Sequence, residues 1–440
     1  MKRESRVSQW VRLDNASNIF LAARNDADPK VFRFSAEMDH EVDPECLQDA
    51  LDETYERYPL YHAVLRRGIF WYYLQQSDLH PRVTPDDSYP CAPIYLADRR
   101  TLLFRVMYHD RRVILEIFHA LSDGTGALWF LTDLVNSYVE RRYSAERPGS
   151  RTADEPSHEL TGDSFTHYFR RARRSETEEP NDVEHDLPKV PARRVFQLGG
   201  TRTPDNRPRV VELTMPATDV LALARTEGVS ISVYLTALFF ESARISSGDM
   251  GETRTIAASV PVNLRQFFPS DSARNFFATV RVGHTYGDGD DSFRAICASL
   301  ESQLRAKATS HALERKVRRL IRFERMPLLR IVPRPLKDVI LRIINWGNNR
   351  GLSLAISNMG RVTLPEFVEP HVARLFLGVS AIRPQFCALS HGGSLTITFT
   401  SPFVETDHVR EFARMLTSSG VDVTVSANRT TEDELAEAAT

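Results

Sequence analysis

The sequence is short of the features that mark several large classes of protein. It holds 4 cysteines. Cys46, Cys91, Cys297 and Cys387 form no CxxC pair, so neither a zinc knuckle nor a disulfide framework is indicated. No apolar run reaches transmembrane length, and the N-terminal residues include charges but no apolar segment. The formal net charge is -2 at pH 7, which gives no overall attraction to nucleic acid. These absences predict a cytoplasmic protein that is neither secreted nor membrane-spanning and does not bind nucleic acid.

What is present is an ordinary globular composition, with 42% hydrophobic and 26% charged residues over a length of 440. A chain of this length exceeds what one hydrophobic core usually supports, so two lobes are expected. Residues 144–208 carry scattered proline and charge with little periodic apolar content, which predicts a partly disordered crossover. We therefore expect an N-terminal lobe over residues 1–195, which includes most of this crossover, and a C-terminal lobe over residues 196–440.

Two local patterns predict the elements of the first lobe. Residues 31–38 alternate with period two, as in a strand, and Asp43 followed by Pro44 is typical of a helix start. Residues 112–118 read as a buried strand, whereas apolar residues spaced by three and four from position 127 indicate a helix. His119 lies at the end of that strand, in a bend that contains Gly124. A histidine held there can point a ring nitrogen into a cavity and act as a general base at neutral pH.

Four motifs then point to one family. His119-x-x-x-Asp123-Gly124 matches an HxxxDG motif. An arginine-containing segment at 56–66 precedes it, and Val-Pro-Val-Asn-Leu-Arg at 260–265 and Ser-Asn-Met-Gly at 357–360 follow it. In this order they resemble the chloramphenicol acetyltransferase-like acyltransferases, which include condensation domains, alcohol acetyltransferases and wax-ester synthases. The last segment resembles the alcohol acetyltransferase branch. Phe118 replaces the first histidine of the common HH pair, and the DFGWG motif of the plant BAHD branch is absent.

The resemblance implies a two-lobed α/β (α+β) fold of mixed sheets and helices, with the active site in a tunnel between the lobes. It implies that His119 is the base in acyl transfer from a thioester, acyl-CoA or a carrier-bound acyl group, to a hydroxyl or amine of a small-molecule or lipid acceptor. O-acyl transfer is expected over N-acyl transfer, by a monomer without a bound cofactor. A thioester is already activated, so no covalent nucleophile is needed, and the sequence has no GxSxG elbow.

The roles of the other site residues follow partly from the resemblance. It implies that Asp123 is structural and forms an ion pair with an arginine, for which Arg66 is the candidate. Asp123 is also a suitable helix N-cap, and both roles can coexist. Gly124 is expected where the chain must turn without a Cβ atom. A metal site at His119 and Asp123 would need further ligands that the sequence does not supply, so none is predicted.

Three neutral side chains are candidates for stabilising the oxyanion. Asn263, Ser357 and Asn358 are expected at strand ends or turns, where a structural role is equally open. Two other functions remain: a condensation-type, amide-forming enzyme that uses carrier-bound substrates, and a non-catalytic docking module of the same fold. The retained His119 argues against the docking module. The absence of an adenylation domain or carrier-serine motif favours a stand-alone enzyme that uses acyl-CoA.

One stretch, residues 305–350, is strongly basic, with 13 lysines or arginines against 3 acidic residues. Apolar residues lie among these charges, a composition typical of basic amphipathic helices. Three interpretations are open. The helices pack on the second lobe with a solvated basic face, they lie as a lid on an anionic membrane and collect a lipophilic acceptor, or they attract the phosphates of CoA.

Overall fold

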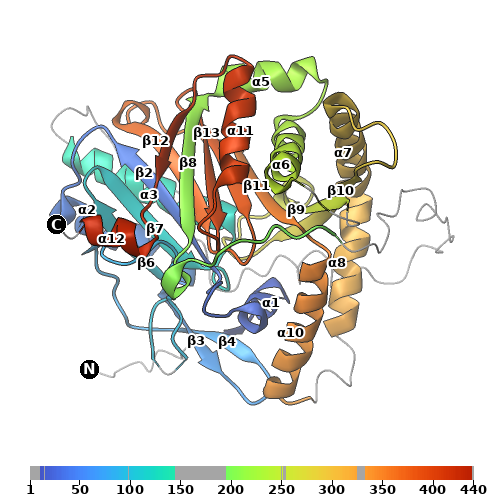
Figure 1. Cartoon of the computed structure of the whole chain (residues 1–440). Helices are drawn as coiled ribbons and strands as arrows, with labels where there is room; N and C mark the ends of the chain where they lie inside the picture. Colours follow the sequence, from blue (N-terminus) through green and yellow to red (C-terminus); the bar gives the residue numbers. More distant parts are fainter. Residues whose placement is uncertain are drawn as a thin grey trace, which may run out of the picture.

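The computed structural model describes residues 10–13, 15–97, 99–143, 195–248, 250, 254–324 and 332–438. Most of the predicted crossover, residues 144–194, lies outside these ranges. The described strands form a sheet of seven, a sheet of five and a small sheet of three strands. The two larger sheets carry separate hydrophobic cores (Figure 1). The predicted class, a two-lobed mixed α/β fold, is therefore confirmed.

The first lobe is built on the five-stranded sheet in the order β12-β2-β7-β6-β5. Its strands are β2 (Val31–Met38), β5 (Thr84–Pro85), β6 (Phe104–His109), β7 (Arg112–Phe118) and β12 (Val372–Val379). Helices α2 (Pro44–Arg57) and α3 (Gly124–Arg142) pack against each other beside it. Asp43 caps α2 by accepting hydrogen bonds from the backbone N–H groups of Glu45 and Cys46. The strand predicted at 31–38 and this predicted helix start are both confirmed.

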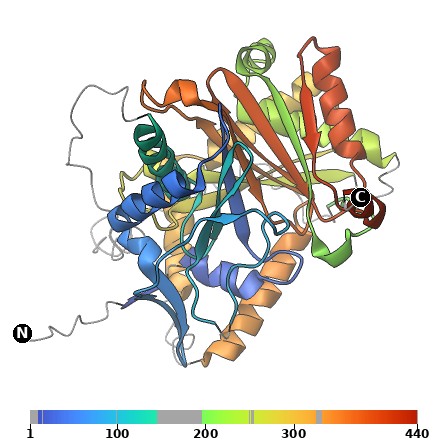
Figure 2. The same cartoon turned by 90° about the vertical axis from the view of Figure 1, so that its left-hand side faces the viewer.

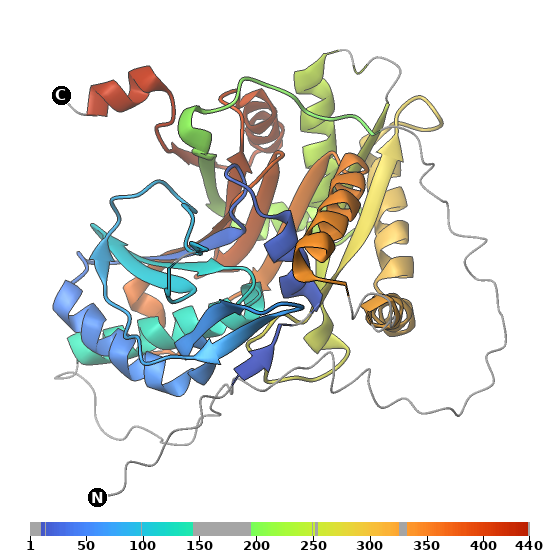
Figure 3. The ribbon, with the colours of Figure 1, turned by 90° about the horizontal axis from the view of Figure 1, so that it is seen from below.

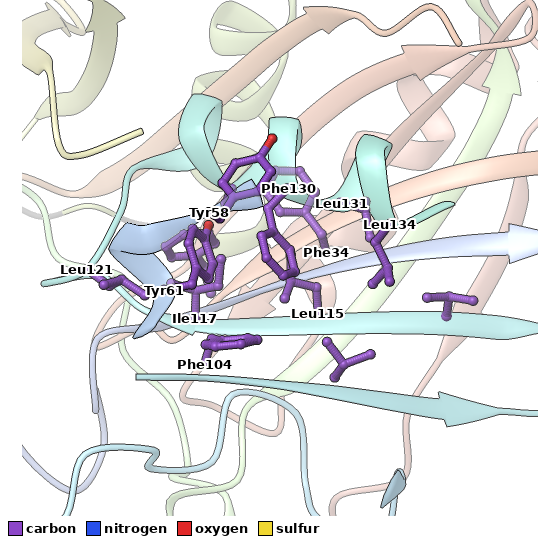
Figure 4. Close-up of a cluster of buried hydrophobic side chains, with 14 of the residues drawn as sticks. Phe34, Tyr58, Tyr61, Phe104, Leu115, Ile117, Leu121, Phe130, Leu131 and Leu134 are labelled. Carbon is purple, nitrogen blue, oxygen red and sulfur yellow. The ribbon is translucent and has the colours of Figure 1, made fainter. Parts of the chain in front are cut away.

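An aromatic cluster joins α3 to the sheet beneath it (Figure 4). The rings of Tyr61 and Phe130 stack with centroids 4.2 Å apart, and Phe104 of β6 meets both rings edge-on. Tyr58 packs edge-on against Phe130 and donates its hydroxyl hydrogen to Asp133 of α3 at 2.7 Å. Buried aromatic pairs contribute about 0.5–1.5 kcal/mol beyond the area that they bury. The cluster therefore fixes α3 on the strands that lead to the predicted catalytic bend.

The second lobe is built on the seven-stranded sheet in the order β10-β9-β11-β13-β14-β8-β15. Its strands are β8 (Arg209–Pro216), β9 (Thr255–Asn263), β10 (Phe277–Thr285), β11 (Leu354–Arg361), β13 (Gln385–His391), β14 (Ser394–Ser401) and β15 (Thr424–Ala427). The helices of its core include α5 (Ala217–Thr226), α6 (Ile231–Ser247), α7 (Phe293–Lys307) and α11 (Asp407–Ser418). In Figure 2 the helices of the first lobe, in blue and teal, and those of the second, in green and red, lie at opposite sides of the view.

The chain returns to the first lobe late in the sequence. β12 pairs antiparallel with β2, and the first core also includes Val362, Val368, Leu375 and Cys387. The predicted boundary near residue 195 therefore does not separate the two sheets, since a strand from the C-terminal half completes the N-terminal one. Neither β12 nor β13 was predicted.

A smaller layer lies below the two lobes in Figure 1. It contains the three-stranded sheet of β1 (Trp10–Arg12), β4 (Tyr72–Gln76) and β3 (Ala63–Arg67), together with α1 (Asn15–Ala23), α8 (Ser310–Glu324) and α10 (Arg334–Arg350). A short helix, α12 (Glu432–Ala438), ends the described chain.

The basic stretch divides into two helices that pack differently. α8 buries Leu313 and Val317 in the second core, as the first of the three interpretations predicted. α10 packs on α1 instead, as Figure 3 shows. Among the described residues, no helix is long and apolar enough to cross a bilayer.

Candidate active site

His119 lies in the tight bend between β7 and α3, as predicted, and its backbone is held on both sides. Its N–H donates to the carbonyl oxygen of Lys30 at 2.8 Å, and its carbonyl oxygen accepts from Nδ2 of Asn275 at 2.9 Å. The N–H of Leu121 donates to the Phe118 carbonyl at 2.8 Å and closes the turn. Asn275 comes from the second lobe, so both lobes fix the position of the histidine.

Three phenylalanine rings surround the imidazole. Phe20 of α1 stacks on it with centroids 4.0 Å apart and an interplanar angle of 22°. Phe32 of β2 meets it edge-on at 4.9 Å, and Phe277 of β10 lies tilted at 5.8 Å. No local sequence pattern predicts these contacts, because each ring comes from a different element. Together they hold the imidazole plane in one orientation and exclude water from its faces.

This enclosure controls the protonation state of His119. Burial desolvates the imidazolium and lowers the pKa of His119 below its ordinary value of 6.5, while the carboxylate of Asp123 and the side chain of Asn275 oppose this shift. The Nδ1 atom is buried without a well-aligned hydrogen-bond partner, although its own carbonyl group and Asn275 lie close enough to raise the pKa. The Nε2 atom is not enclosed in this way. The ring is therefore neutral at pH 7, with Nε2 available as an acceptor.

The carboxylate of Asp123 accepts several hydrogen bonds at the start of α3. It caps the helix, since Oδ1 accepts from the N–H of Gly126 at 2.9 Å. Its Oδ2 accepts from Nη1 of Arg265 at 2.7 Å and from the N–H of Phe276 at 2.8 Å. The side chains of Arg265 and Asp123 are only 7% and 5% exposed, so this is a buried ion pair. The predicted N-cap is confirmed, and an ion pair with an arginine is present.

The predicted partner, Arg66, was wrong. Arg66 lies on β3, opposite Tyr73 of β4, and its Nε donates to Oε1 of Gln75 at 2.8 Å. Arg265 takes the place beside Asp123, and its Nη2 also donates to the carbonyl oxygens of Ser272 and Arg274, at 2.6 and 2.7 Å. Arg265 ends the segment 260–265 that the sequence motif had singled out, so the signal for it was present.

The two glycines of the bend avoid close contacts from the second lobe. A Cβ atom at Gly124 would lie 3.0 Å from Sδ of Met359, and one at Gly126 would lie 2.2 Å from the carbonyl oxygen of Ala273. Neither glycine has a positive φ angle. The expectation that Gly124 serves a turn that only glycine can adopt is therefore wrong, because close approach of the second lobe is the reason for both glycines.

The three oxyanion candidates differ in what they contact. Oδ1 of Asn263 accepts from the N–H of Arg265, and Nδ2 donates to Oγ1 of Thr125 at 3.2 Å. Nδ2 of Asn358 donates to Oγ of Ser232 at 2.9 Å, so this side chain faces α6. Both amides have the structural role that was left open.

Ser357 lies on the opposite face of β11 from Asn358. It pairs with Cys387 of β13, and the pairing of these two strands shifts register after Asn358. A role of Ser357 at the site therefore stays a prediction.

A cavity of about 320 Å³ lies between the two large sheets. Arg112 of β7 and Glu212 of β8 line it and join the lobes through a bidentate ion pair with distances of 3.0 and 2.8 Å. His119 is not among the residues that line this cavity. A tunnel between the lobes that contains His119 therefore stays a prediction.

Comparisons with known proteins identify the fold. No protein-family model and no curated protein matches the sequence. Among solved structures, polyketide synthase associated protein 5 from Mycobacterium tuberculosis matches at a TM-score of 0.60 and 14% identity, over 93% of this chain and 97% of that one. The TRI3 trichothecene 15-O-acetyltransferase from Fusarium sporotrichioides matches at 0.64 and 11% identity, over 94% of both chains.

Domains of peptide synthetases share the same architecture. The epimerization domain from the third module of tyrocidine synthetase B matches at a TM-score of 0.59 and 10% identity, over 95% of this chain and 97% of that one. The starter condensation domain of rhizomide synthetase matches at 0.56 and 13% identity, over 94% and 97%. The chain therefore has the fold of chloramphenicol acetyltransferase-like acyltransferases and condensation domains, as its motifs predicted.

The ion pair gives a first prediction. Asp123→Ala should lower the free energy of unfolding by about 3–5 kcal/mol, because it leaves the guanidinium of Arg265 buried without its counter-charge. In a urea-unfolding double-mutant cycle, Asp123→Ala combined with Arg265→Ala should cost clearly less than the sum of the two single losses. Arg66→Ala is the control, and its effect should add to that of Asp123→Ala. Additive losses for Asp123 and Arg265 would contradict the coupling.

Proposed function

We propose that the protein is an acyltransferase that moves an acyl group from a thioester to a hydroxyl or amine, with His119 as the general base. The observation that carries this proposal is the state of His119: neutral because it is buried, enclosed by rings from both lobes, and with Nε2 still accessible. The Nε2 atom removes the proton from the acceptor as its oxygen or nitrogen attacks the thioester carbonyl carbon. The protonated ring then returns that proton to the departing thiolate.

Each residue around His119 has a different role in this mechanism. A positioned base contributes about 10²–10⁴ in rate, and holding donor and acceptor together supplies much of the rest. Asp123 is structural, since its carboxylate already accepts three hydrogen bonds, one of them from its ion-pair partner Arg265. Asn275 is a positioning residue because it binds the backbone of His119. For the developing oxyanion we propose Ser357, since the amides of Asn263 and Asn358 are engaged in structural hydrogen bonds.

A cluster of three cationic residues, Arg281, Lys307 and Lys316, supports acyl-CoA as the donor. The ammonium groups of Lys307 and Lys316 donate to the carbonyl oxygens of Arg281 and Thr279 on β10, at 2.7 Å for Lys307. Desolvation lowers the pKa of Lys307, and the neighbouring charges of Arg281 and Lys316 lower it further. Among the described residues, no acidic side chain forms an ion pair with any of the three. Like charges held together in this way are suited to the phosphates of CoA.

The outer face of β10 connects this cluster to His119. Val280 and Val282 point into the core, whereas Phe277, Thr279 and Arg281 lie on the other face. Phe277 contacts His119, and Arg281 lies four positions further along the strand, a span of about 13 Å. A pantetheine arm lying along this face would bring its thioester to His119 while the phosphates remain at the cluster.

The alternatives predict different behaviour. A condensation-type enzyme with carrier-bound substrates would need the pantetheine arm but not the additional phosphates of CoA. A docking module would not transfer the acyl group at all. The acceptor class, a small molecule or a lipid, and the preference for O-acyl transfer remain part of the proposal. Incubation with a panel of acyl-CoAs and of alcohols or amines, with detection of the free thiol, tests acyl transfer directly.

A second prediction concerns the base. His119→Ala should reduce kcat by about 10²–10⁴ and leave the protein folded, because the bend around His119 is held by backbone hydrogen bonds that the substitution keeps. Thiol release is measured alongside urea unfolding. His311→Ala, which removes an exposed histidine of α8, is the control and should keep full activity. Retention of more than about a tenth of wild-type kcat in His119→Ala would remove His119 from the role of base.

The third prediction is the pH dependence of the reaction. The base acts when it is neutral, and burial lowers its pKa below 6.5. Therefore kcat/KM should still exceed half of its plateau value at pH 6.5 and should reach half only at lower pH. Because the Asn275 side chain raises the pKa of His119, Asn275→Ala should move this decline to still lower pH. A half-maximal rate at or above pH 6.5 in the wild-type protein would contradict the assignment.

The fourth prediction separates CoA from a carrier as the donor. Lys307→Ala and Arg281→Ala should raise KM for acyl-CoA by about tenfold each and leave kcat unchanged, since each lost phosphate contact contributes about 1.5–3 kcal/mol at most. The same variants should not affect acyl-pantetheine, which lacks the phosphates of CoA. Arg315→Ala and Arg319→Ala, which remove exposed charges of α8, are the matched controls. An equal change with both donors would show that the cluster does not bind these phosphates.

A further inference from the structure

Large apolar side chains are exposed mainly in one region of the molecule. The described residues include twelve such side chains, and seven of them lie on α10 or at the turn between β3 and β4: Ile69, Phe70, Leu336, Val339, Ile343, Ile344 and Trp346. Single exposed apolar residues are normal on a protein surface, whereas a contiguous group marks a site of interaction. This group is called the α10 surface below.

The α10 surface is continuous because the helix and the turn contact each other. Leu336, Val339, Ile343 and Trp346 follow one another by three or four residues and so form one stripe along the helix. Lys337, in the first turns of α10, donates to the carbonyl oxygen of Phe70 at 3.1 Å. The tip of the β3–β4 hairpin therefore lies beside the N-terminal end of α10, as Figure 1 shows.

The charges around this surface are mainly positive. Arg342 and Arg350 are exposed on α10, and the guanidinium of Arg350 lies 3.9 Å from the ring centroid of Trp346. The acidic residue of α10, Asp338, accepts a hydrogen bond from the hydroxyl of Tyr72 at 3.0 Å. An apolar stripe flanked by arginines matches the interface of an anionic bilayer, where acyl chains lie beneath negative headgroups.

We propose that the α10 surface docks on an anionic lipid membrane, with the stripe at the level of the headgroups and the arginines on the phosphates. A second copy of the chain fits less well, because a symmetric contact would bring the same arginines against each other. Among the described side chains of α8, the apolar Leu313 and Val317 are buried in the second core. The membrane contact considered for residues 305–350 is thereby assigned to α10 and extended to the β3–β4 turn.

Docking at this surface has a consequence for the substrate. α10 packs on α1, and Phe20 of α1 stacks on the ring of His119. A bound membrane would therefore lie against the helix pair that closes one side of the site. Resting on the proposed acyl transfer, this arrangement points to an acceptor that is itself lipophilic and enters from the bilayer.

Co-sedimentation with vesicles tests the docking without reference to activity. The full-length protein should pellet with vesicles of phosphatidylcholine mixed with phosphatidylglycerol, and not with phosphatidylcholine alone. High salt should weaken the binding because it screens the arginines. Ile343→Glu should reduce the partition coefficient by about tenfold or more, because it places a charge in the apolar stripe. Arg342→Glu combined with Arg350→Glu should have a similar effect.

Matched substitutions elsewhere control for general effects of charge. Val425→Glu replaces a comparably exposed side chain on β15, and Arg315→Glu combined with Arg319→Glu reverses exposed charges on α8. Neither control should alter binding. Equal or absent binding to both vesicle types would overturn the proposal, as would a dimer in sedimentation velocity that Ile343→Glu dissociates.

The effect on substrate is measured separately from docking. Ile343→Glu should lower the rate with an acceptor dissolved in vesicles and leave the rate with a water-soluble acceptor unchanged. Vesicle binding without thiol release from any acceptor would refute the proposed acyl transfer and leave the docking intact. Thiol release with equal loss for both acceptors would refute the entry route alone.

Discussion

The rest of the site depends on one buried ion pair, that between Asp123 and Arg265. Removing two charges from water costs several kcal/mol each, so such a pair persists only where further hydrogen bonds satisfy it. Here the carboxylate of Asp123 also accepts from the N–H groups of Gly126 and Phe276. The Nη2 atom of Arg265 donates to two carbonyl oxygens of the 272–274 loop, whereas its buried Nε has no partner among the described residues. These bonds form only when the two lobes pack in one relative position. The pair therefore contributes more to the specificity of this packing than to the net free energy of folding.

This relative position of the lobes determines the environment of His119. The loop that Arg265 holds continues into Asn275 and Phe277, which contact the backbone and the ring of the histidine. Burial beside Phe277 and Phe20 lowers the pKa of His119, whereas the side chain of Asn275 opposes this shift. In the proposed mechanism the carboxylate of Asp123 is structural, because both of its oxygens accept hydrogen bonds. Its influence on the chemistry passes through geometry and through a modest electrostatic effect on the imidazole.

Local patterns predicted the parts of this arrangement that are local in origin. The strand ending at Phe118, the N-cap at Asp123 and the start of α2 follow from side-chain period and capping chemistry within a few residues. The partner of Asp123 does not, because Arg66 and Arg265 are equally suitable in composition and only the packing of the lobes decides between them. β12 was missed for a similar reason, since its pairing with β2 joins residues more than 300 positions apart.

Composition alone does not predict how the two basic helices, α8 and α10, pack in the fold. α8 and α10 share an amphipathic pattern, yet the apolar side of α8 is buried in the second core and that of α10 is largely exposed. The free energy gained by burying an apolar stripe is the same in either place, so the sequence alone cannot tell which helix finds a partner within the fold. α10 instead uses its other side to pack on α1, next to Phe20. If the proposed docking holds, the helix pair of α1 and α10 would place the covered stripe on the same side of the molecule as Phe20, which stacks on His119.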